Sequence, residues 1–248
     1  MCNIAIFLGI AVAIATVVAG HHLISFLVGA LLCGIAETHG RCGKSHIGMT
    51  APFAGFNPQM WFKCASAYSG GGLATSYLVG LGIAGLGTLT AVAVSPVVLF
   101  IVACMVGLAM FLRELGIVRF KPPQCDVQTH KWWAVEFGLV TAAGMWGAHI
   151  GLALTTVITH GGLYPLVLIA FASGLGSGEW ILLAFWVGRV VTLWLTPSLS
   201  GKSTDGVALS EALSQAAPSF KATAICGLAI LCTTCVAVSS TVLIGFGG

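Results

Sequence analysis

The chain has 248 residues; 58% of them are hydrophobic, only 7% are charged, and the formal net charge is +3. A soluble domain carries about a quarter charged residues, so the composition excludes a water-soluble globular protein, and the small, dispersed positive charge gives no basis for a nucleic-acid partner. Apolar runs of about 20 residues, enough to cross a bilayer, recur throughout, whereas the short alternating segments of a membrane barrel are absent. We therefore expect a single all-α integral membrane domain over residues 1–248, surrounded by the lipid bilayer.

The first apolar run begins almost at the first residue. A cleaved signal peptide would carry a basic region before such a run, and because none is present we expect the run to be retained as a span. The runs at 4–19 and 22–36 are either two short spans joined at His21 and His22, which gives seven spans in all, or one broken span, which gives six.

Five further apolar runs are expected near 64–84, 88–112, 132–158, 163–195 and 219–245. A straight helix over 163–195 would be about 50 Å long at 1.5 Å per residue, far longer than a hydrocarbon core of about 30 Å. A break is therefore predicted in the glycine-rich stretch 173–180. The predicted fold class is a polytopic transmembrane helix bundle of six or seven spans with glycine-broken helices.

Three longer polar connections are expected, near 37–62, 113–131 and 196–218, and very short turns at 20–22, 84–88 and 159–163. All lysines and arginines except Arg189 lie in or beside the longer connections, and the short turns hold none. By the positive-inside rule, the long basic connections face the cytoplasm. This places the protein in a cell inner (cytoplasmic) membrane with its C-terminus outside.

Three stretches open a span after a cytoplasmic connection in a similar way: "MWFKCASAYSGGG", "KWWAVEFGLVTAAG" and "SFKATAICGLAIL". In each, aromatic residues mark the membrane interface and small residues follow. The pattern suggests three related helix-loop-helix units, although apolar sequences also resemble one another through composition alone.

The stretch "RELGIVRFKPPQ" at 113–124, followed by "WAVEFGLVTAAG", resembles a group of uncharacterised actinobacterial multi-span membrane proteins. These are distantly similar to the thiol-disulfide electron carriers of cytochrome c biogenesis and to a superfamily of small-solute exporters, and the resemblance covers roughly 113–190. Those electron carriers place a cysteine beside a proline in two spans, whereas Pro96 and Pro165 have no adjacent cysteine, which puts thiol chemistry in doubt. Cys232 and Cys235 form a C-x-x-C inside an apolar run, where thiolates are disfavoured and packing is the simpler role.

Glu179 lies in "GLGSGEW", within a run that is otherwise apolar from 163 to 188. Acidic residues at membrane depth are costly and usually functional, and transporters build midplane sites at broken helices. Arg189 could pair with Glu179; alternatively, the glycine-rich stretch is an external loop that leaves Glu179 in water. Glu136 is the third transport candidate, and its simpler role is an interfacial ion pair with Lys131 or Arg113.

His39, Cys42 and His46 have short, metal-compatible spacings in the first long connection, and Cys125 and His130 lie in the second. If both connections fold together under the membrane, they could form a Cys2His2 site for zinc or copper on the cytoplasmic face. The alternative is that the first connection is an ordinary solvated loop.

Two of the histidines His22, His149 and His160, if they faced each other, could ligate a haem. A neutral histidine that hydrogen-bonds a neighbouring helix is the commoner arrangement in membranes.

Three functions remain open. The first is a transporter or carrier of a small solute, ion or metal, favoured by Glu179, the broken helices and the resemblance. The second is a non-catalytic structural subunit of a larger membrane complex, such as a respiratory or oxidoreductase complex, and the third is a thiol or haem electron carrier. We find no phosphate loop, nucleophile elbow or zincin motif, so we do not expect an enzyme. The expected protein partners are other membrane subunits or further copies of the chain.

Overall fold

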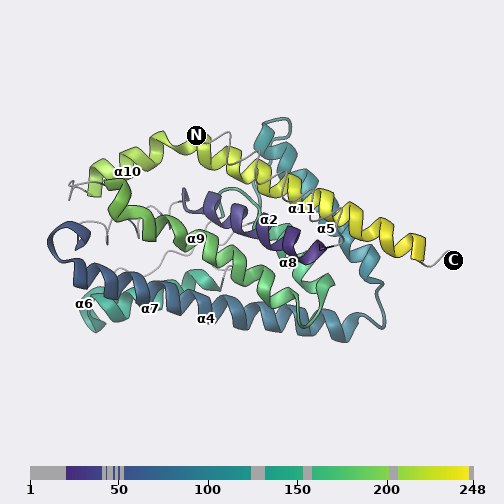
Figure 1. Cartoon of the computed structure of the whole chain (residues 1–248), viewed down its shortest axis with the longest axis horizontal. Coiled ribbons are helices and arrows are strands. Elements are labelled where there is room, and N and C mark those ends of the chain that lie inside the picture. Colours follow the sequence, from purple (N-terminus) through teal and green to yellow (C-terminus); the bar gives the residue numbers. More distant parts are fainter. Residues whose placement is uncertain are drawn as a thin grey trace.

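The computed structural model describes residues 21–40, 43, 47, 50, 53–123, 132–152, 158–200 and 206–245. Across these residues the regular structure is helical throughout, as predicted (Figure 1). The helices are α2 (His22–Glu37), α4 (Pro58–Thr90), α5 (Pro96–Leu115), α6 (Trp133–Phe137), α7 (Leu139–Gly151), α8 (Leu163–Ser173), α9 (Gly178–Ser200), α10 (Gly206–Gln215) and α11 (Ala217–Gly245).

Four helical segments in the described part of the chain are long and apolar enough to cross a membrane: Pro58–Thr90, Pro96–Leu115, Gly178–Leu195 and Ala217–Val242. These segments support the predicted membrane bundle. The apolar helices α2 and α8 have 16 and 11 residues, which makes them about 24 Å and 16 Å long. Both are shorter than a core of about 30 Å, so the helices described here do not add up to six or seven full spans. The run at 4–19 lies outside the described residues.

The predicted break in the segment 163–195 is confirmed. Helix α8 ends at Ser173 and α9 begins at Gly178. Between them, Gly174 and Gly176 have φ angles of 67° and 91°, which only glycine adopts without strain. The chain therefore reverses direction within a few residues.

Two other predicted boundaries are wrong. The expected turn at 84–88 lies inside α4, which continues to Thr90, and the turn comes just before Pro96 at the start of α5. Pro96 is suited to the first turn of a helix because the missing N–H would be unpaired there. The expected single span over 132–158 is divided at Gly138, whose φ of 78° interrupts the helix, and α7 ends at Gly151.

Helix α4 packs along α7 and α9, α2 packs against both α9 and α11, and α5 packs against α8 and α11. In Figure 1, α6 and α10 lie at one end of the long axis and the last turns of α11 at the other. Glycines allow these helices to approach closely: a Cβ at Gly87 would overlap the carbonyl of Phe171 in α8, and one at Gly34 would overlap the carbonyl of Phe185 in α9. The abundance of glycine thus reflects close helix packing.

Candidate functional site

Charged and polar side chains from three separate segments meet inside the bundle. We call this group the carboxylate–histidine cluster; its members are Glu37, Arg113, Glu114, Thr159 and His160. Glu37 ends α2, Arg113 and Glu114 lie in the last turn of α5, and Thr159 and His160 precede α8. Glu37 is only 1% exposed, and Glu114 and His160 are each 6% exposed. Buried carboxylates are unfavourable unless they are paired, so the partners of these groups define the site.

The Glu37 carboxylate binds the backbone of the connection between α7 and α8. It accepts hydrogen bonds from the N–H of Thr159 at 2.9 Å and from the N–H of His160 at 2.7 Å, one on each oxygen. Bonds from N–H groups to an ionised carboxylate are stronger than bonds between neutral groups. Through these two hydrogen bonds, Glu37 holds the connection against the end of α2.

Glu114 joins a cation to an imidazole. One of its oxygens accepts from Nη1 of Arg113 at 2.8 Å, and the other lies 3.0 Å from Nδ1 of His160. The same Nη1 also donates to the carbonyl of Thr159 at 3.1 Å. Arg113 therefore links α5 to the connection that Glu37 holds.

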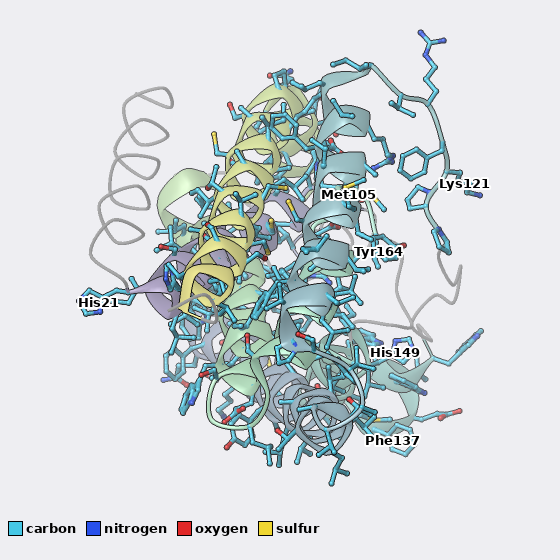
Figure 2. All side chains as sticks on the ribbon, turned by 90° about the vertical axis from the view of Figure 1, so that its right-hand side faces the viewer. His21, Met105, Lys121, Phe137, His149 and Tyr164 are labelled. Atoms are coloured by element: carbon cyan, nitrogen blue, oxygen red, sulfur yellow. The ribbon has the colours of Figure 1, made fainter. Side chains whose placement is uncertain are left out.

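The Arg113 side chain, which is 23% exposed, links the cluster to the molecular surface. It lines an open surface hollow of about 530 Å³ together with Gly116, Val118, Arg119, Phe120 and Lys121. Figure 2 shows Lys121 projecting outwards on the side of the molecule where Tyr164 lies. Tyr164 donates a hydrogen bond to the carbonyl of Pro123, which brings the segment after α5 close to the start of α8.

His160 has one engaged and one free ring nitrogen. Its Nε2 is buried and has no hydrogen-bond partner within the described part of the chain. The His39 ring lies 6.0 Å from the His160 ring, and the same His39 ring lies 5.6 Å from the Phe220 ring of α11. Within the described residues, the contact with Glu114 is thus the only hydrogen bond that anchors the ring.

The predicted pair of Glu179 and Arg189 is not formed. Glu179 is buried, at 6% exposed, and accepts from the N–H of Gly176 at 3.0 and 3.2 Å, so it stabilises the turn between α8 and α9. It is therefore not the water-exposed loop residue of the alternative hypothesis. Arg189 lies ten residues further along α9, about 15 Å away. Its guanidinium carbon is 5.9 Å from the centre of the Phe185 ring.

The other predicted ion pair, between Glu136 and Arg113, is also not formed. Arg113 binds Glu114 instead, Glu136 is exposed on α6, and Lys131 lies outside the described residues. The transport roles of Glu179, Arg189 and Glu136 stay predictions, but only Arg189 lies near the cluster. Its carbonyl accepts from the hydroxyl of Thr38, the residue after Glu37, at 3.2 Å.

Of the predicted metal ligands, Cys42, His46, Cys125 and His130 lie outside the described residues. His39 is described and lies beside His160. Within the described ranges, no three metal-binding side chains lie close enough together to hold an ion.

Of the three histidines proposed for haem, His22 faces neither His160 nor His149. His22 begins α2 and Glu37 ends it, so about 22 Å separates them, and His160 is bonded to Glu37. His149 contacts the Trp133 ring, 6.3 Å away. Figure 2 shows it on the opposite side of the molecule from His21, the neighbour of His22.

The turn at 159–163 does not lie where the charge pattern placed it. We expected it at the opposite membrane face from the connections that follow Glu37 and Arg113, yet Thr159 and His160 bind these residues directly. These contacts place the start of α8 beside the ends of α2 and α5. They also bring His160 into a site which the sequence patterns did not indicate.

The intramembrane cysteines also meet in a way that their spacing did not indicate. Cys104 of α5 and Cys232 of α11 contact each other's backbone, with Sγ to carbonyl oxygen distances of 3.7 and 3.8 Å. Cys235, one turn further along α11, is fully buried. These contacts occur at a helix crossing and agree with a packing role.

Comparison with protein-family models, with curated proteins and with solved structures finds no match to this chain. The function is therefore argued from the residues and geometry described above.

Proposed function

We propose that the protein is a membrane carrier for a small ion or solute, and that the carboxylate–histidine cluster is the polar part of its pathway. The observation that carries this proposal is the position of Glu37. Its carboxylate is 1% exposed and holds the connection between two short helices through two backbone N–H groups. Acidic groups buried in a membrane bundle are costly and most often have a functional role.

The lengths of α7 and α8 support the proposal. These helices have 13 and 11 residues, or about 20 and 16 Å, and neither can cross a core of about 30 Å alone. Discontinuous helices that meet polar groups near the membrane centre are a recurrent way to form a transport site. Here the link between the two helices is bonded to Glu37 and Arg113, so a change at the cluster would alter how α7 and α8 are held.

Arg189 is a further candidate contact for a solute. It is 6% exposed and belongs to the apolar segment Gly178–Leu195. Both ion pairs found among the described residues involve Glu114, so the Arg189 guanidinium has no carboxylate partner there. A buried cation without a counter-ion favours a negatively charged group nearby.

The proposal can be tested with purified protein reconstituted in liposomes on a solid-supported membrane. Concentration jumps of amino acids, inorganic anions and divalent metal ions should produce a transport current for at least one class. Glu37→Gln should abolish this current, because the amide cannot hold both N–H groups. Glu211→Gln, at an exposed glutamate of α10, should leave it intact. A current that survives in Glu37→Gln would remove the cluster from the pathway.

Sizing of the gently solubilised native protein separates the carrier from the structural subunit. A monomer or homo-oligomer is expected for a carrier. A discrete assembly with other chains, together with the absence of any transport current, would favour a subunit of a larger complex.

A further inference from the structure

Three basic side chains meet at the end of α5. Arg113, Arg119 and Lys121 line the open surface hollow of about 530 Å³, and none of the described residues that line it is acidic. The volume lies within the range of small-molecule sites, roughly 300–1,000 Å³. The hollow is therefore large enough for a charged group together with the apolar part that carries it.

The chain forms this hollow by folding back on α5. Gly116 has a φ of 81° and ends the helix, and its N–H donates to the carbonyl of Arg113 at 2.9 Å. Nε of Arg113 donates to the carbonyl of Phe120 at 3.3 Å, and Tyr164 of α8 donates to the carbonyl of Pro123. Figure 2 shows the segment after α5 running back beside that helix. These contacts hold both sides of the hollow in position.

Two of the three cations have no counter-ion in the described part of the chain. Both ion pairs found there involve Glu114, so Arg119 and Lys121 are unpaired among these residues. In and beside the carboxylate–histidine cluster, two carboxylates and two guanidinium groups balance one another: Glu37, Glu114, Arg113 and Arg189. The charges of Arg119 and Lys121 are therefore left uncompensated, and the hollow favours an anion.

The length of α5 places the hollow at the level of the lipid headgroups. This helix has 20 residues, or about 30 Å, which matches a hydrocarbon core of about 30 Å. A helix of this length that crosses the bilayer ends where the headgroups begin. A stripe of exposed apolar side chains runs along α5 at helical spacing: Val98, Ile101, Met105 and Leu108. Gly116, which lines the hollow, lies about three turns beyond Met105 on the same face of the helix.

We propose that the hollow binds the headgroup of one anionic phospholipid, and that an acyl chain of this lipid lies along the exposed stripe of α5. The phosphate would lie between Arg113, Arg119 and Lys121. Nη2 of Arg113 has no hydrogen-bond partner among the described residues, so it can donate to a phosphate oxygen, and such charge-assisted bonds are strong. Basic pockets beside membrane helices bind anionic headgroups through the same chemistry.

The apolar members of the hollow favour a lipid over a water-soluble anion. Val118 and Phe120 line the hollow beside the cations and are 41% and 37% exposed, and the neighbouring Ile117 is 67% exposed. A free phosphate would pair with the cations and leave these side chains in water. The glycerol and the first acyl carbons of a phospholipid would cover them, which is favourable. A zwitterionic phospholipid adds an ammonium group, which the uncompensated cations repel.

Arg113 connects the lipid site to the carboxylate–histidine cluster. Its Nη1 donates to Glu114 and to the carbonyl of Thr159, and both bonds can remain when Nη2 binds a phosphate. Bound lipid would therefore hold Arg113 in place and stabilise the connection before α8. The inference goes beyond the carrier function and stands without it, because Arg119 and Lys121 take no part in the cluster.

The test is native mass spectrometry of the purified protein in detergent, with added phosphatidylglycerol or phosphatidylcholine of the same acyl chains. The wild-type protein should bind one phosphatidylglycerol at least about tenfold more tightly than phosphatidylcholine. Arg119→Gln and Lys121→Gln should each weaken phosphatidylglycerol binding about fivefold, which corresponds to about 1 kcal/mol for one cation near an anionic lipid. Lys63→Gln, the matched control, removes an exposed lysine at the start of α4 and should bind like the wild type.

Three results would overturn the proposal. The first is equal affinity of the wild-type protein for both lipids, and the second is wild-type affinity in both Arg119→Gln and Lys121→Gln. The third is displacement of the bound lipid by an equal concentration of glycerophosphoglycerol, the soluble headgroup, because this would show a site for a free anion.

If the variants fail to fold, labelling of the wild-type protein with a water-soluble amine reagent decides. Lys121 should react more slowly, relative to Lys63, in liposomes of phosphatidylglycerol than in liposomes of phosphatidylcholine. The ratio of the two rates corrects for the effect of membrane charge on the reagent. An unchanged ratio would also overturn the proposal.

Discussion

Replacing Glu37 by alanine tests most directly how the cluster holds the bundle together. The change removes the acceptors of two backbone N–H groups, the part-buried one of Thr159 and the buried one of His160. A hydrogen bond to a charged group contributes about 1.5–3 kcal/mol, and two such bonds would give about 3–6 kcal/mol. Removing a buried charge recovers part of its desolvation penalty, so we expect a loss near the lower end, about 3 kcal/mol.

Glu37→Gln should lie between the wild-type protein and Glu37→Ala. The amide oxygen can accept one N–H, but the amide nitrogen meets the other N–H as a second donor, so about one bond is lost, or about 1.5–3 kcal/mol. The free energy of unfolding can be measured by titration with sodium dodecyl sulfate in mixed micelles, followed by tryptophan fluorescence. Glu136→Ala should match the wild type. A Glu37→Ala protein as stable as Glu136→Ala would show that these two bonds do not hold the connection.

Three further predictions concern packing. Gly87→Ala should destabilise the protein by about 1–3 kcal/mol, because the added Cβ would overlap the Phe171 carbonyl. Gly82→Ala has open space around it and should be neutral or slightly stabilising. Unfolding titrations of the two variants compare these effects directly. Cys104 and Cys232 should be joined by a short bifunctional thiol reagent in native membranes, and a Cys104→Ser control should abolish the product seen on a gel. Gly176→Ala, at a φ of 91°, should lower the free energy of unfolding by about 1 kcal/mol or more and lower the thermal midpoint. Gly70→Ala, also in open space, should leave the thermal midpoint unchanged.

Apolar length and glycine position together predicted the parts of the fold that depend on the bilayer. The run 163–195 was too long for one span, and the break came at the glycines between Ser173 and Gly178. The same reasoning failed at Gly138, because the apolar run continues on both sides and nothing in its composition marks a positive φ. It failed again at 84–88, where glycines pack α4 against α8 instead of ending the helix.

The sequence contains the separate residues of the site but did not indicate that they lie together. Glu37 and Glu114 both follow long apolar runs, and each could be explained alone as the point where a helix leaves the lipid. What joins them is His160, whose backbone N–H binds Glu37 and whose ring lies against Glu114. A rule that assigns each turn to one membrane face assumes that every helix crosses completely, and α7 and α8 are too short to do so.

A structural role alone accounts for much of the cluster. Non-helical backbone at membrane depth persists only where protein groups satisfy its N–H and C=O groups, and Glu37 and Arg113 do this for Thr159 and His160. Glu114 in turn pairs with Arg113. The Nε2 atom of His160 has no part in that explanation, because it satisfies no backbone group and has no partner among the described residues. A cluster that served only to hold the connection would be equally satisfied by an asparagine at position 160. The carrier proposal therefore predicts that His160→Asn keeps the fold and loses the transport current.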